Sequence, residues 1–465
     1  MGPLAVSDSE AVIRLYKSED KIHPRAVDGF FARWRWACVA LTQLVFYGLP
    51  WLTWGDRPAV LFDLASRRFY IFGLVLYPQD FVYLTALLLI SAYSLFLFTA
   101  IAGRVWCGYA CPQTVYTEIF VRIEQWFEGD RHARLRLDKA GWSVNKLWRK
   151  GGKHGVWIAL SLFTGLSFVG YFTPIRELMS LSFSGWEAFW VLFYGFATYG
   201  NAGFMREQVC KYMCPYARFQ SAMFDRDTLI VSYDPARGEP RGHNTQRKKG
   251  EAHALGDCID CKLCVQVCPT GIDIREGLQY ECISCAACID VCDGVMDKMG
   301  TSRGLIRYDT ENGMARGFSR GQRLRRVLRP RVLVYGALLL LVGGALMWSL
   351  WSRHDFRVDV IRDRATLARQ VEDGWVENVY RLQLMNATER PQLLHVEADG
   401  LPGLKLSQAT QVALAPAEAR WVTVTLRLPP QSLSGLKPGA QPMRWRVSSD
   451  GGDTVTEKST FILPR

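Results

Sequence analysis

Two cysteine runs dominate the sequence: residues 258–269 read CIDCKLCVQVCP and residues 282–293 read CISCAACIDVCD. In each run, three cysteines lie three positions apart, and a fourth follows four positions later. Three thiolates on one tight loop can hold three corners of an iron–sulfur cubane, and the fourth cysteine then binds the other cluster. The spacing predicts one 4Fe–4S cluster at Cys258, Cys261, Cys264 and Cys292, and a second at Cys282, Cys285, Cys288 and Cys268. Two structural zinc sites are the alternative, which the duplicated spacing disfavours.

Residues 255–296 resemble a bacterial two-cluster ferredoxin domain, and the resemblance implies two 4Fe–4S centres. One position departs from that pattern. Pro269 follows the last cysteine of the first run, whereas Asp293 follows Cys292 in the second. Because a proline at this position turns the chain away, we expect different packing around that cluster and an unchanged set of ligands.

The composition indicates a membrane protein with soluble parts. The chain has 465 residues, 49% of them hydrophobic, and a net charge of +12. The mean hydropathy of +0.01 lies between the values typical of membrane and soluble proteins. This excludes a disordered chain and a fibre. The positive charge lies beside apolar stretches, as in the cytoplasmic loops of membrane proteins, so we expect no nucleic-acid partner.

Five stretches are long enough to cross a bilayer as helices: Trp36–Trp54, Phe81–Ile101, Val156–Ile175, Trp186–Phe204 and Val332–Trp351. Six Lys or Arg precede the first stretch, ten lie in residues 102–155, and seven Arg lie in residues 316–331. This bias predicts a multi-pass protein of the bacterial inner membrane, with the N-terminus and the cysteine runs in the cytoplasm. The C-terminus is then periplasmic.

The remaining apolar segments are shorter. Phe69–Tyr77 is too short to span, and we expect it to lie at the membrane interface or to re-enter. Residues 352–465 contain short β-rich runs separated by Gly, Pro, Asn and Asp, which predicts an immunoglobulin-like β-sandwich. The expected strands are Phe356–Ile361, Trp375–Met385, Leu393–Glu397, Trp421–Leu428, Met443–Val447 and Thr454–Leu463.

The predicted fold is therefore mixed: a bundle of five transmembrane helices, an inserted ferredoxin-like domain and a C-terminal β-sandwich. The expected segments are a cytoplasmic N-terminus, a four-helix membrane domain, a ferredoxin-like domain with its linker, a basic segment with the fifth helix, and the periplasmic sandwich. Their bounds are 1–35, 36–232, 233–315, 316–351 and 352–465.

A second cysteine motif, Cys-x-x-x-Cys-Pro, occurs twice, each time six residues after a predicted span. Proline is favoured at a helix start and disfavours helix in the residue before it. Cys111 and Cys214 are therefore expected at the N-terminal edges of helices, where exposed N–H groups stabilise a thiolate. Such thiolates are soft ligands that favour Cu(I), or they are redox-active thiols. The alternative is that these cysteines, like Cys38 in the first span, only pack.

The segments WCGYACPQT (106–114), KYMCPYARFQ (211–220), GEPRG (238–242) and GLIRY (304–308) resemble the FixG/RdxA/CcoG family. Asp293 agrees with that family, which has Asp at the same place. The resemblance implies a membrane-bound cupric reductase that supplies Cu(I) for assembly of cbb3-type cytochrome c oxidase. It also implies that the copper-handling residues are Cys107, Cys111, Cys210 and Cys214.

The leading hypothesis is therefore an oxidoreductase that passes single electrons through two 4Fe–4S clusters to copper, its substrate. Met213 could add a thioether ligand, or simply face lipid or the protein core. One alternative is a quinol dehydrogenase-type electron-transfer subunit, and another is a non-catalytic assembly scaffold or copper chaperone. Expected partners are the oxidase subunits or assembly factors, a cytosolic electron donor and the lipid membrane. Copper could be bound within one chain or across a homodimer.

Overall fold

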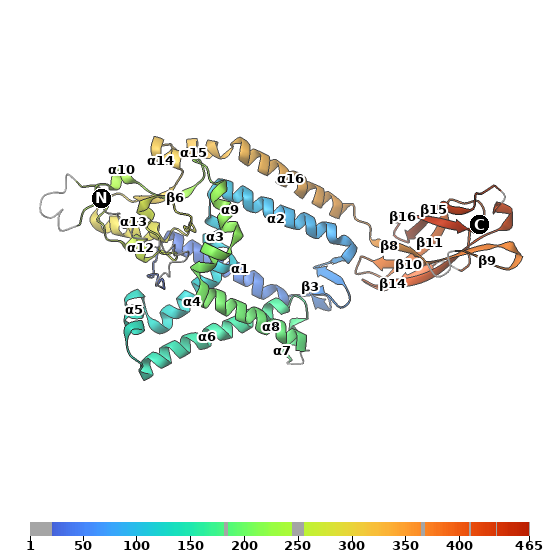
Figure 1. The fold of residues 1–465 in the computed structure, drawn as a ribbon, viewed down its shortest axis with the longest axis horizontal. Coiled ribbons are helices and arrows are strands. Elements are labelled where there is room, and N and C mark those ends of the chain that lie inside the picture. The colour runs from blue at the N-terminus through green and yellow to red at the C-terminus, as the bar shows by residue number, and fades with distance from the viewer. Residues whose placement is uncertain are drawn as a thin grey trace, which may run out of the picture. The chain divides into compact units, whose positions relative to one another are not determined.

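A computed structural model describes residues 21–180, 185–243, 255–363, 368–408, 411–433 and 435–464 (Figure 1). The chain divides into two compact units. Unit 1 comprises Met1–Val39, Thr99–Trp157 and Gly200–Val327, and unit 2 comprises Ala40–Phe98, Ile158–Tyr199 and Leu328–Arg465.

Each predicted span is largely helical. The corresponding helices are α1 (Phe30–Gly48), α2 (Phe81–Ala102), α6 (Val144–Val169), α8 (Gly185–Thr198) and α16 (Pro330–Trp351). Within the described residues, two helical segments are long and apolar enough to cross a membrane: Pro78–Ala102, with a mean hydropathy of 2.1, and Pro330–Trp351, with 2.0. The expectation of five transmembrane helices is thus met for α2 and α16 and not for the other three.

The other three helices fall short for different reasons. Helix α1 carries two arginines near its start, and the predicted span continues past its end into a short turn. Helix α6 begins with several polar and basic residues, and α8 has 14 residues before the chain becomes π-helical over Tyr199–Met205.

These three helices also contact one another. Tyr47 of α1 and Thr164 of α6 share a hydrogen bond of 2.8 Å between their hydroxyl groups. A Cβ added at Gly165 of α6 would lie 2.3 Å from the carbonyl oxygen of Val191 in α8. Small residues that let helix backbones approach closely are typical of membrane bundles. Helices packed in this way do not need to be apolar on every side.

The segment Phe69–Tyr77 forms strands, and its place at the membrane interface stays a prediction. It lies in a three-stranded antiparallel sheet of β3 (Val60–Asp63), β4 (Arg68–Ile71) and β5 (Leu74–Leu76). Ile71 pairs directly with Leu74, so two residues form the hairpin turn. Tyr77 then donates a hydrogen bond of 2.8 Å to the carbonyl oxygen of Asn386, which ties this sheet to the sandwich.

The C-terminal part is a β-sandwich, as predicted. One sheet has the order β12-β14-β10-β8, with β9 also paired to β10, and the other has the order β13-β11-β15-β16. Its strands are β8 (Phe356–Arg362), β9 (Arg369–Gln370), β10 (Val376–Asn386), β11 (Gln392–Asp399), β12 (Lys405–Leu406), β13 (Gln411–Leu414), β14 (Ala419–Leu428), β15 (Gly439–Ser449) and β16 (Thr454–Leu463). All six predicted strands are present.

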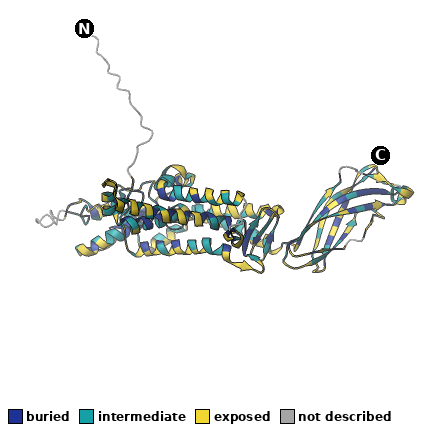
Figure 2. Cartoon of the chain, turned by 90° about the horizontal axis from the view of Figure 1, so that it is seen from below, coloured by how far each residue is buried: buried dark blue, intermediate teal, exposed yellow. Residues whose placement is uncertain are grey.

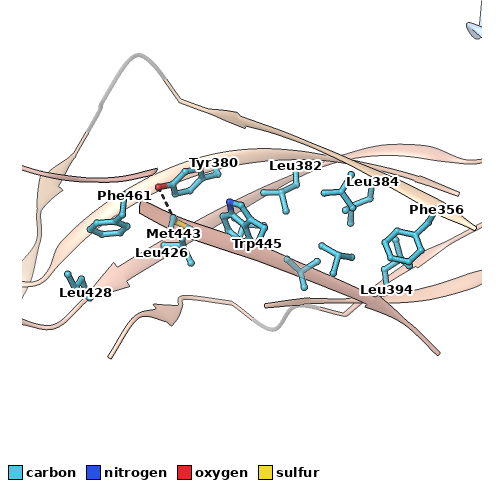
Figure 3. Packing of buried hydrophobic residues seen from close by; sticks show 14 of the residues in the cluster. Phe356, Tyr380, Leu382, Leu384, Leu394, Leu426, Leu428, Met443, Trp445 and Phe461 are labelled. Carbon is cyan, nitrogen blue, oxygen red and sulfur yellow. Dashed lines mark hydrogen bonds between the residues drawn. The ribbon is translucent and has the colours of Figure 1, made fainter. Parts of the chain in front are cut away.

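The core of the sandwich lies between these sheets. Alternate residues of β14, such as Val424 and Leu426, are buried, as the alternating pattern predicts. Figure 3 shows Trp445 among the labelled core residues, with the hydroxyl of Tyr380 3.6 Å from the sulfur of Met443. Figure 2 shows buried residues along the sandwich strands and many exposed residues on the long helices.

The cysteine runs lie in unit 1. Strand β6 (Ile230–Tyr233) pairs antiparallel with β7 (Ile306–Asp309), so the two strands bracket the segment that contains both runs. Residues 244–254 of the predicted linker lie outside the described residues.

The described part of unit 1 also contains the helices α3 (Val105–Tyr109), α4 (Pro112–Glu128), α5 (Arg131–Lys139), α9 (Pro215–Met223), α10 (Pro235–Gly238), α12 (Leu263–Gln266), α13 (Ala287–Met299), α14 (Glu311–Arg316) and α15 (Arg320–Val327). Unit 2 adds α7 (Ile175–Met179), α17 (Pro430–Leu433) and the pair β1 (Thr53–Trp54) and β2 (Arg57–Pro58).

Candidate iron–sulfur and thiol site

Two small cavities collect the eight cysteines of the two runs. The first, of about 380 Å³, is lined by Cys258, Cys261, Cys264 and Cys292. The second, of about 350 Å³, is lined by Cys268, Cys282, Cys285 and Cys288, and it also touches Cys264. The structure therefore brings each predicted ligand set together around its own cavity, including the exchange of the fourth cysteine between the runs.

The backbone of both runs follows the same unusual path. Asp260 and Lys262 flank the second cysteine of the first run, and both have positive φ. Ser284 and Ala286 occupy the equivalent positions of the second run and also have positive φ. Non-glycine residues adopt this left-handed conformation at a cost, and such residues cluster at functional sites. The repeated geometry indicates that each loop is shaped to wrap its three cysteines around a bound group.

The departure at Asp293 has a structural reason. Helix α13 begins at Ala287 and continues through Cys292 to Met299, so residue 293 lies inside a helix. A proline there would remove a backbone donor and clash with the preceding turn. Asp293 instead accepts a hydrogen bond of 2.9 Å from the backbone N–H of Gly304. In the first run, α12 has already ended at Gln266 before Pro269.

The chemistry of these cavities fits iron–sulfur clusters. Burial raises the pKa of Cys264 to about 11 and the pKa of Cys282 and Cys292 to about 12. A thiol in such surroundings keeps its proton until a metal replaces it. In the part of the chain that the structure describes, no three Cys, His, Asp or Glu side chains could hold a single metal ion. The four thiolates of a cubane each bind a different iron, so they need not meet at one point.

The Cys-x-x-x-Cys-Pro motifs form two hairpins, and the prediction for their second cysteines is confirmed. Cys111 is the N-cap of α4 and Cys214 is the N-cap of α9, each followed by proline. The first cysteines differ in setting. Cys107 lies in α3 and is buried, whereas Cys210 lies in a π-helical turn and is partly exposed. We call residues 104–112 the first hairpin and residues 207–215 the second hairpin.

Reciprocal hydrogen bonds hold the two hairpins together. Gln113, after the first motif, donates to the carbonyl oxygens of Asn201 and Arg206 at 3.0 Å each. Tyr216, after the second motif, shares a hydroxyl–hydroxyl hydrogen bond with Thr99 at the end of α2. The thiol of Cys107 donates to the buried amide oxygen of Gln220 in α9 at 3.5 Å. Each hairpin is therefore anchored on the segment that carries the other.

The four thiols act on one another electrostatically. Burial, together with Cys111, Cys107 and Cys214, raises the pKa of Cys210 to about 12 against the opposing effect of Arg104. Burial likewise raises the pKa of Cys107, again opposed by Arg104. The arrangement therefore brings the four predicted copper-handling cysteines into one neighbourhood.

The first hairpin packs directly on the second cysteine run. A Cβ added at Gly108 would lie 2.7 Å from the carbonyl oxygen of Ile283 and 2.9 Å from the Cα of Cys285. Cys107 belongs to the same buried cluster as Ile283 and Cys285. Only glycine allows this approach without a shift of the backbone. One of the four thiols thus lies against the loop that shapes the second cavity.

The second hairpin opens to a cleft of about 720 Å³. Cys210 lines this cleft together with Glu207, Gln113 and Glu118, and the opposite side includes Val267. The N-terminal segment Pro24–Val27 forms another part of the cleft wall. The cleft gives a small solute a route to Cys210. Met213, the predicted additional ligand, is exposed on the same turn.

Sequence reasoning missed several residues around this site. Arg104, Gly108 and Gln220 were not singled out, although a glycine inside a cysteine motif is a signal for a close backbone approach.

A buried charge cluster that holds the second hairpin in place was also not predicted from the sequence. Arg206 donates a hydrogen bond of 2.7 Å to Glu124 of α4. Burial alone would raise the pKa of Glu124, but Arg206, Lys21 and Lys153 lower it overall.

Two cavities are each lined by a set of four cysteines on loops of the kind that bind clusters. They define an iron–sulfur protein of the electron-transfer class. Comparisons with known proteins agree. Residues 205–311 match a family model described as a 4Fe-4S dicluster domain, and residues 84–133 match a 4Fe-4S binding domain. Residues 346–464 match the Ig-like fold at the C-terminus of FixG. These models favour iron–sulfur clusters over the zinc alternative.

Whole-chain relatives identify the family. The nitrogen fixation protein FixG of Rhizobium meliloti is 39% identical, with 91% of this chain and 86% of FixG covered. Protein RdxA of Cereibacter sphaeroides is 38% identical, with 94% and 95% covered, and protein RdxB of the same organism is 43% identical, with 80% of each covered. The chain belongs to the FixG/RdxA family.

Proposed function

We propose that this chain is a membrane-bound iron–sulfur oxidoreductase that reduces Cu(II) to Cu(I) for assembly of cbb3-type cytochrome c oxidase. One observation carries the proposal: the hairpin that holds Cys107 packs on the loop that holds Cys285, with Gly108 at the contact. The hairpin that carries a thiol suited to Cu(I) therefore packs closely on a cluster-binding loop. The reduction consumes one electron per copper ion.

The two cysteine runs are proposed to hold the clusters in the sets that line the two cavities. The first cluster binds Cys258, Cys261, Cys264 and Cys292, and the second binds Cys268, Cys282, Cys285 and Cys288. When bound, the clusters supply single-electron transfer. The four residues with a left-handed backbone conformation shape the loops: Asp260, Lys262, Ser284 and Ala286. The apolar walls of the cavities exclude water.

The four motif thiols are proposed to bind the copper substrate. Cu(II) enters by the cleft at Cys210, whose wall holds the carboxylates of Glu207 and Glu118 as well as four arginines. Thiolates stabilise Cu(I) over Cu(II), so binding by two of the thiols of Cys107, Cys111, Cys210 and Cys214 at a time makes the reduction easier. The proton that Cys210 loses on binding copper leaves by the same cleft.

We propose that α2 and α16 cross the inner membrane and that α1, α6 and α8 insert beside them. The basic residues before α16 support a cytoplasmic position of the cysteine runs, near a cytosolic electron donor. The sandwich then lies in the periplasm, where it docks oxidase subunits or assembly factors.

The test is an anaerobic assay with the full chain in detergent. We expect protein reduced with dithionite, freed of excess reductant, to convert Cu(II) to Cu(I), detected with a Cu(I)-specific chelator. The Cys107→Ala, Cys210→Ala double variant should lose this activity while the EPR signals of both clusters remain. The matched control is Cys38→Ala, which removes the cysteine outside these motifs. Unchanged reduction by the double variant would refute the copper assignment.

Metal analysis tests the cofactor assignment separately. Two 4Fe–4S clusters correspond to about eight iron and eight sulfide per chain. About twelve iron per chain would mean that the four motif thiols hold a third cluster, which contradicts a copper role. Copper binding without any reduction would favour the scaffold or chaperone alternative.

A second candidate function, quinol oxidation, is favoured by a cavity in unit 2. This cavity, of about 670 Å³, is lined by aromatic residues that include Phe168, Trp190 and Tyr194, together with Glu187 and Thr173. The hydroxyl of Thr173 donates to Glu187 at 3.0 Å. Aromatic walls with a few polar acceptors suit a quinol ring. Reduction of the clusters by a short-chain quinol would support this function, and no reduction would exclude it.

A further inference from the structure

Arg104 lies where the first hairpin meets the second cysteine run. It follows Gly103, which has a φ of +58°, and it directly precedes α3, so the side chain leaves the chain at a tight turn. Its side chain is buried, and one guanidinium nitrogen, Nη1, donates to the carbonyl oxygen of Tyr280, two residues before Cys282. Another, Nε, is buried without a hydrogen-bond partner in the described chain.

The charge of Arg104 is not neutralised locally. Among the described residues, no carboxylate forms an ion pair with it. The arginine at the first cavity, Arg275, differs because carboxylates pair with it. Arg275 forms ion pairs of 2.6 Å with Asp260 and with Asp273, so two negative charges offset its single positive charge. The two cysteine cavities therefore sit in different electrostatic surroundings.

Arg104 lies between the two kinds of cysteine. It precedes Cys107 by three residues, and its guanidinium donates to the carbonyl oxygen of Tyr280, two residues before Cys282. Its contact with Tyr280 and the contact of Gly108 with Cys285 are separate observations that place the hairpin on this run. One buried positive charge is thus shared by two sets of thiols.

We propose that Arg104 is a positioning residue that raises the reduction potential of the cluster held by Cys268, Cys282, Cys285 and Cys288, and makes it the exit point for electrons. Reduction adds a negative charge to a cluster, and a fixed positive charge nearby stabilises the reduced state. At the first cavity, the two aspartates beside Arg275 cancel this effect. The cluster ligand sets are those of the proposed function, but the potential does not depend on copper.

The experiment is an EPR-monitored redox titration of the purified full chain with its clusters. Arg104→Gln removes the charge and keeps a hydrogen-bond donor, and Arg104→Lys keeps the charge. We expect the midpoint potential of one cluster to fall in Arg104→Gln and to return most of the way in Arg104→Lys. The other cluster should titrate as in the wild-type chain. The control is Arg303→Gln, an exposed arginine of the same domain that pairs with Asp297 at 2.8 Å, and it should shift neither potential.

A Cys261→Ala background, which removes an exposed ligand of the first set, identifies the cluster whose potential shifts. The proposal is overturned if both midpoints stay unchanged in Arg104→Gln, if both fall equally, or if the shifted cluster is the first. Should Arg104→Gln retain less iron than the wild type, Arg104→Met gives a second uncharged side chain: a lowered midpoint of the second cluster supports the proposal and an unchanged one overturns it. Loss of copper reduction without a change in potential would argue against the proposal and leave the copper role standing.

Discussion

The two Cys-x-x-x-Cys-Pro hairpins share a motif and differ in almost everything around it. In the first hairpin, Cys107 is buried in an α-helix and Gly108 packs on the loop of Cys285. In the second, Cys210 lies in a π-helical turn, lines a cleft, and is followed by Lys211 where the first hairpin has glycine. The repeat has thus diverged into a hairpin that faces the cysteine run and a hairpin that faces the cleft.

The charges at equivalent positions follow the same division. Three residues before its first cysteine, the first hairpin has the buried Arg104, and the second hairpin has Glu207 on the cleft. A positive charge suits a place where electrons arrive, and a carboxylate suits a path for a copper cation. The comparison predicts that equivalent substitutions in the two hairpins will have different effects.

The largest difference is expected at the residue after the first cysteine. Gly108→Ala would place a Cβ within 3 Å of backbone atoms of Ile283 and Cys285, which cannot move aside as a flexible side chain could. Overpacking of this kind costs about 1–3 kcal/mol. We expect the second cluster to be lost, so that iron falls to about four per chain, measured by iron analysis and EPR.

Lys211→Ala is the matched change in the second hairpin. Lys211 is not among the residues that line the cysteine cavities, so both clusters should remain. Equal iron loss in the two variants would contradict the division between the hairpins.

A smaller difference is expected between the first cysteines themselves. Cys210→Ser alters the wall of the cleft, so it should raise the KM for Cu(II) more than it lowers kcat. Cys107→Ser changes the thiol beside Cys285, so it should lower kcat about tenfold or more with a smaller change in KM. Steady-state reduction of Cu(II) by both variants tests this. Matching changes in kcat and KM would show that the two thiols act as one unit.

Much of this site could be predicted from sequence because cysteine spacing is a local signal. The ligand sets follow from residues close in the chain, and the prolines fix Cys111 and Cys214 at helix starts. The six predicted strands were likewise visible as alternating patterns. The strands in Phe69–Tyr77 were not predicted, because apolar residues suit a strand and a membrane interface equally and the turn at Phe72 gave no Gly-Asn type signal.

The contacts across the site could not be predicted from local patterns. Arg104 and Tyr280 are 176 residues apart in sequence, and the packing of Gly108 on Cys285 depends on the whole of unit 1. The helices α1, α6 and α8 illustrate the same limit. Their helical form was predicted, but their charged residues pair with another helix, as Arg35 of α1 does with Glu118 and Lys150 of α6 with Glu128, and a hydropathy pattern does not contain such contacts.

An effect of intermediate size is expected when the hydrogen bonds that join the hairpins are removed: the loss of stability should differ between the two hairpins. Gln113→Ala removes two hydrogen bonds, to the backbone carbonyl oxygens of Asn201 and Arg206, although Asn201 still accepts from the backbone N–H of Arg206. Tyr216→Phe removes one hydroxyl contact with Thr99. A net contribution of about 1 kcal/mol per hydrogen bond predicts a larger loss for Gln113→Ala. Thermal unfolding in detergent measures both, and an equal or larger loss in Tyr216→Phe would contradict the stronger anchoring of the second hairpin.

The smallest expected effect is a pH dependence confined to the wall of the cleft. His23 precedes Pro24–Val27, and burial, with Lys21 and Arg134, lowers its pKa from 6.5 to about 4. Between these values the unfolded chain binds a proton that the folded chain does not, so stability falls as the pH decreases from 6.5 to about 4. His23→Gln should flatten this part of the profile of thermal midpoint against pH, whereas His243→Gln, at a more exposed histidine, should not.

Since Cys210 shares the cleft with this segment and Cys107 does not line it, acidification should raise the KM for Cu(II) before it affects the clusters.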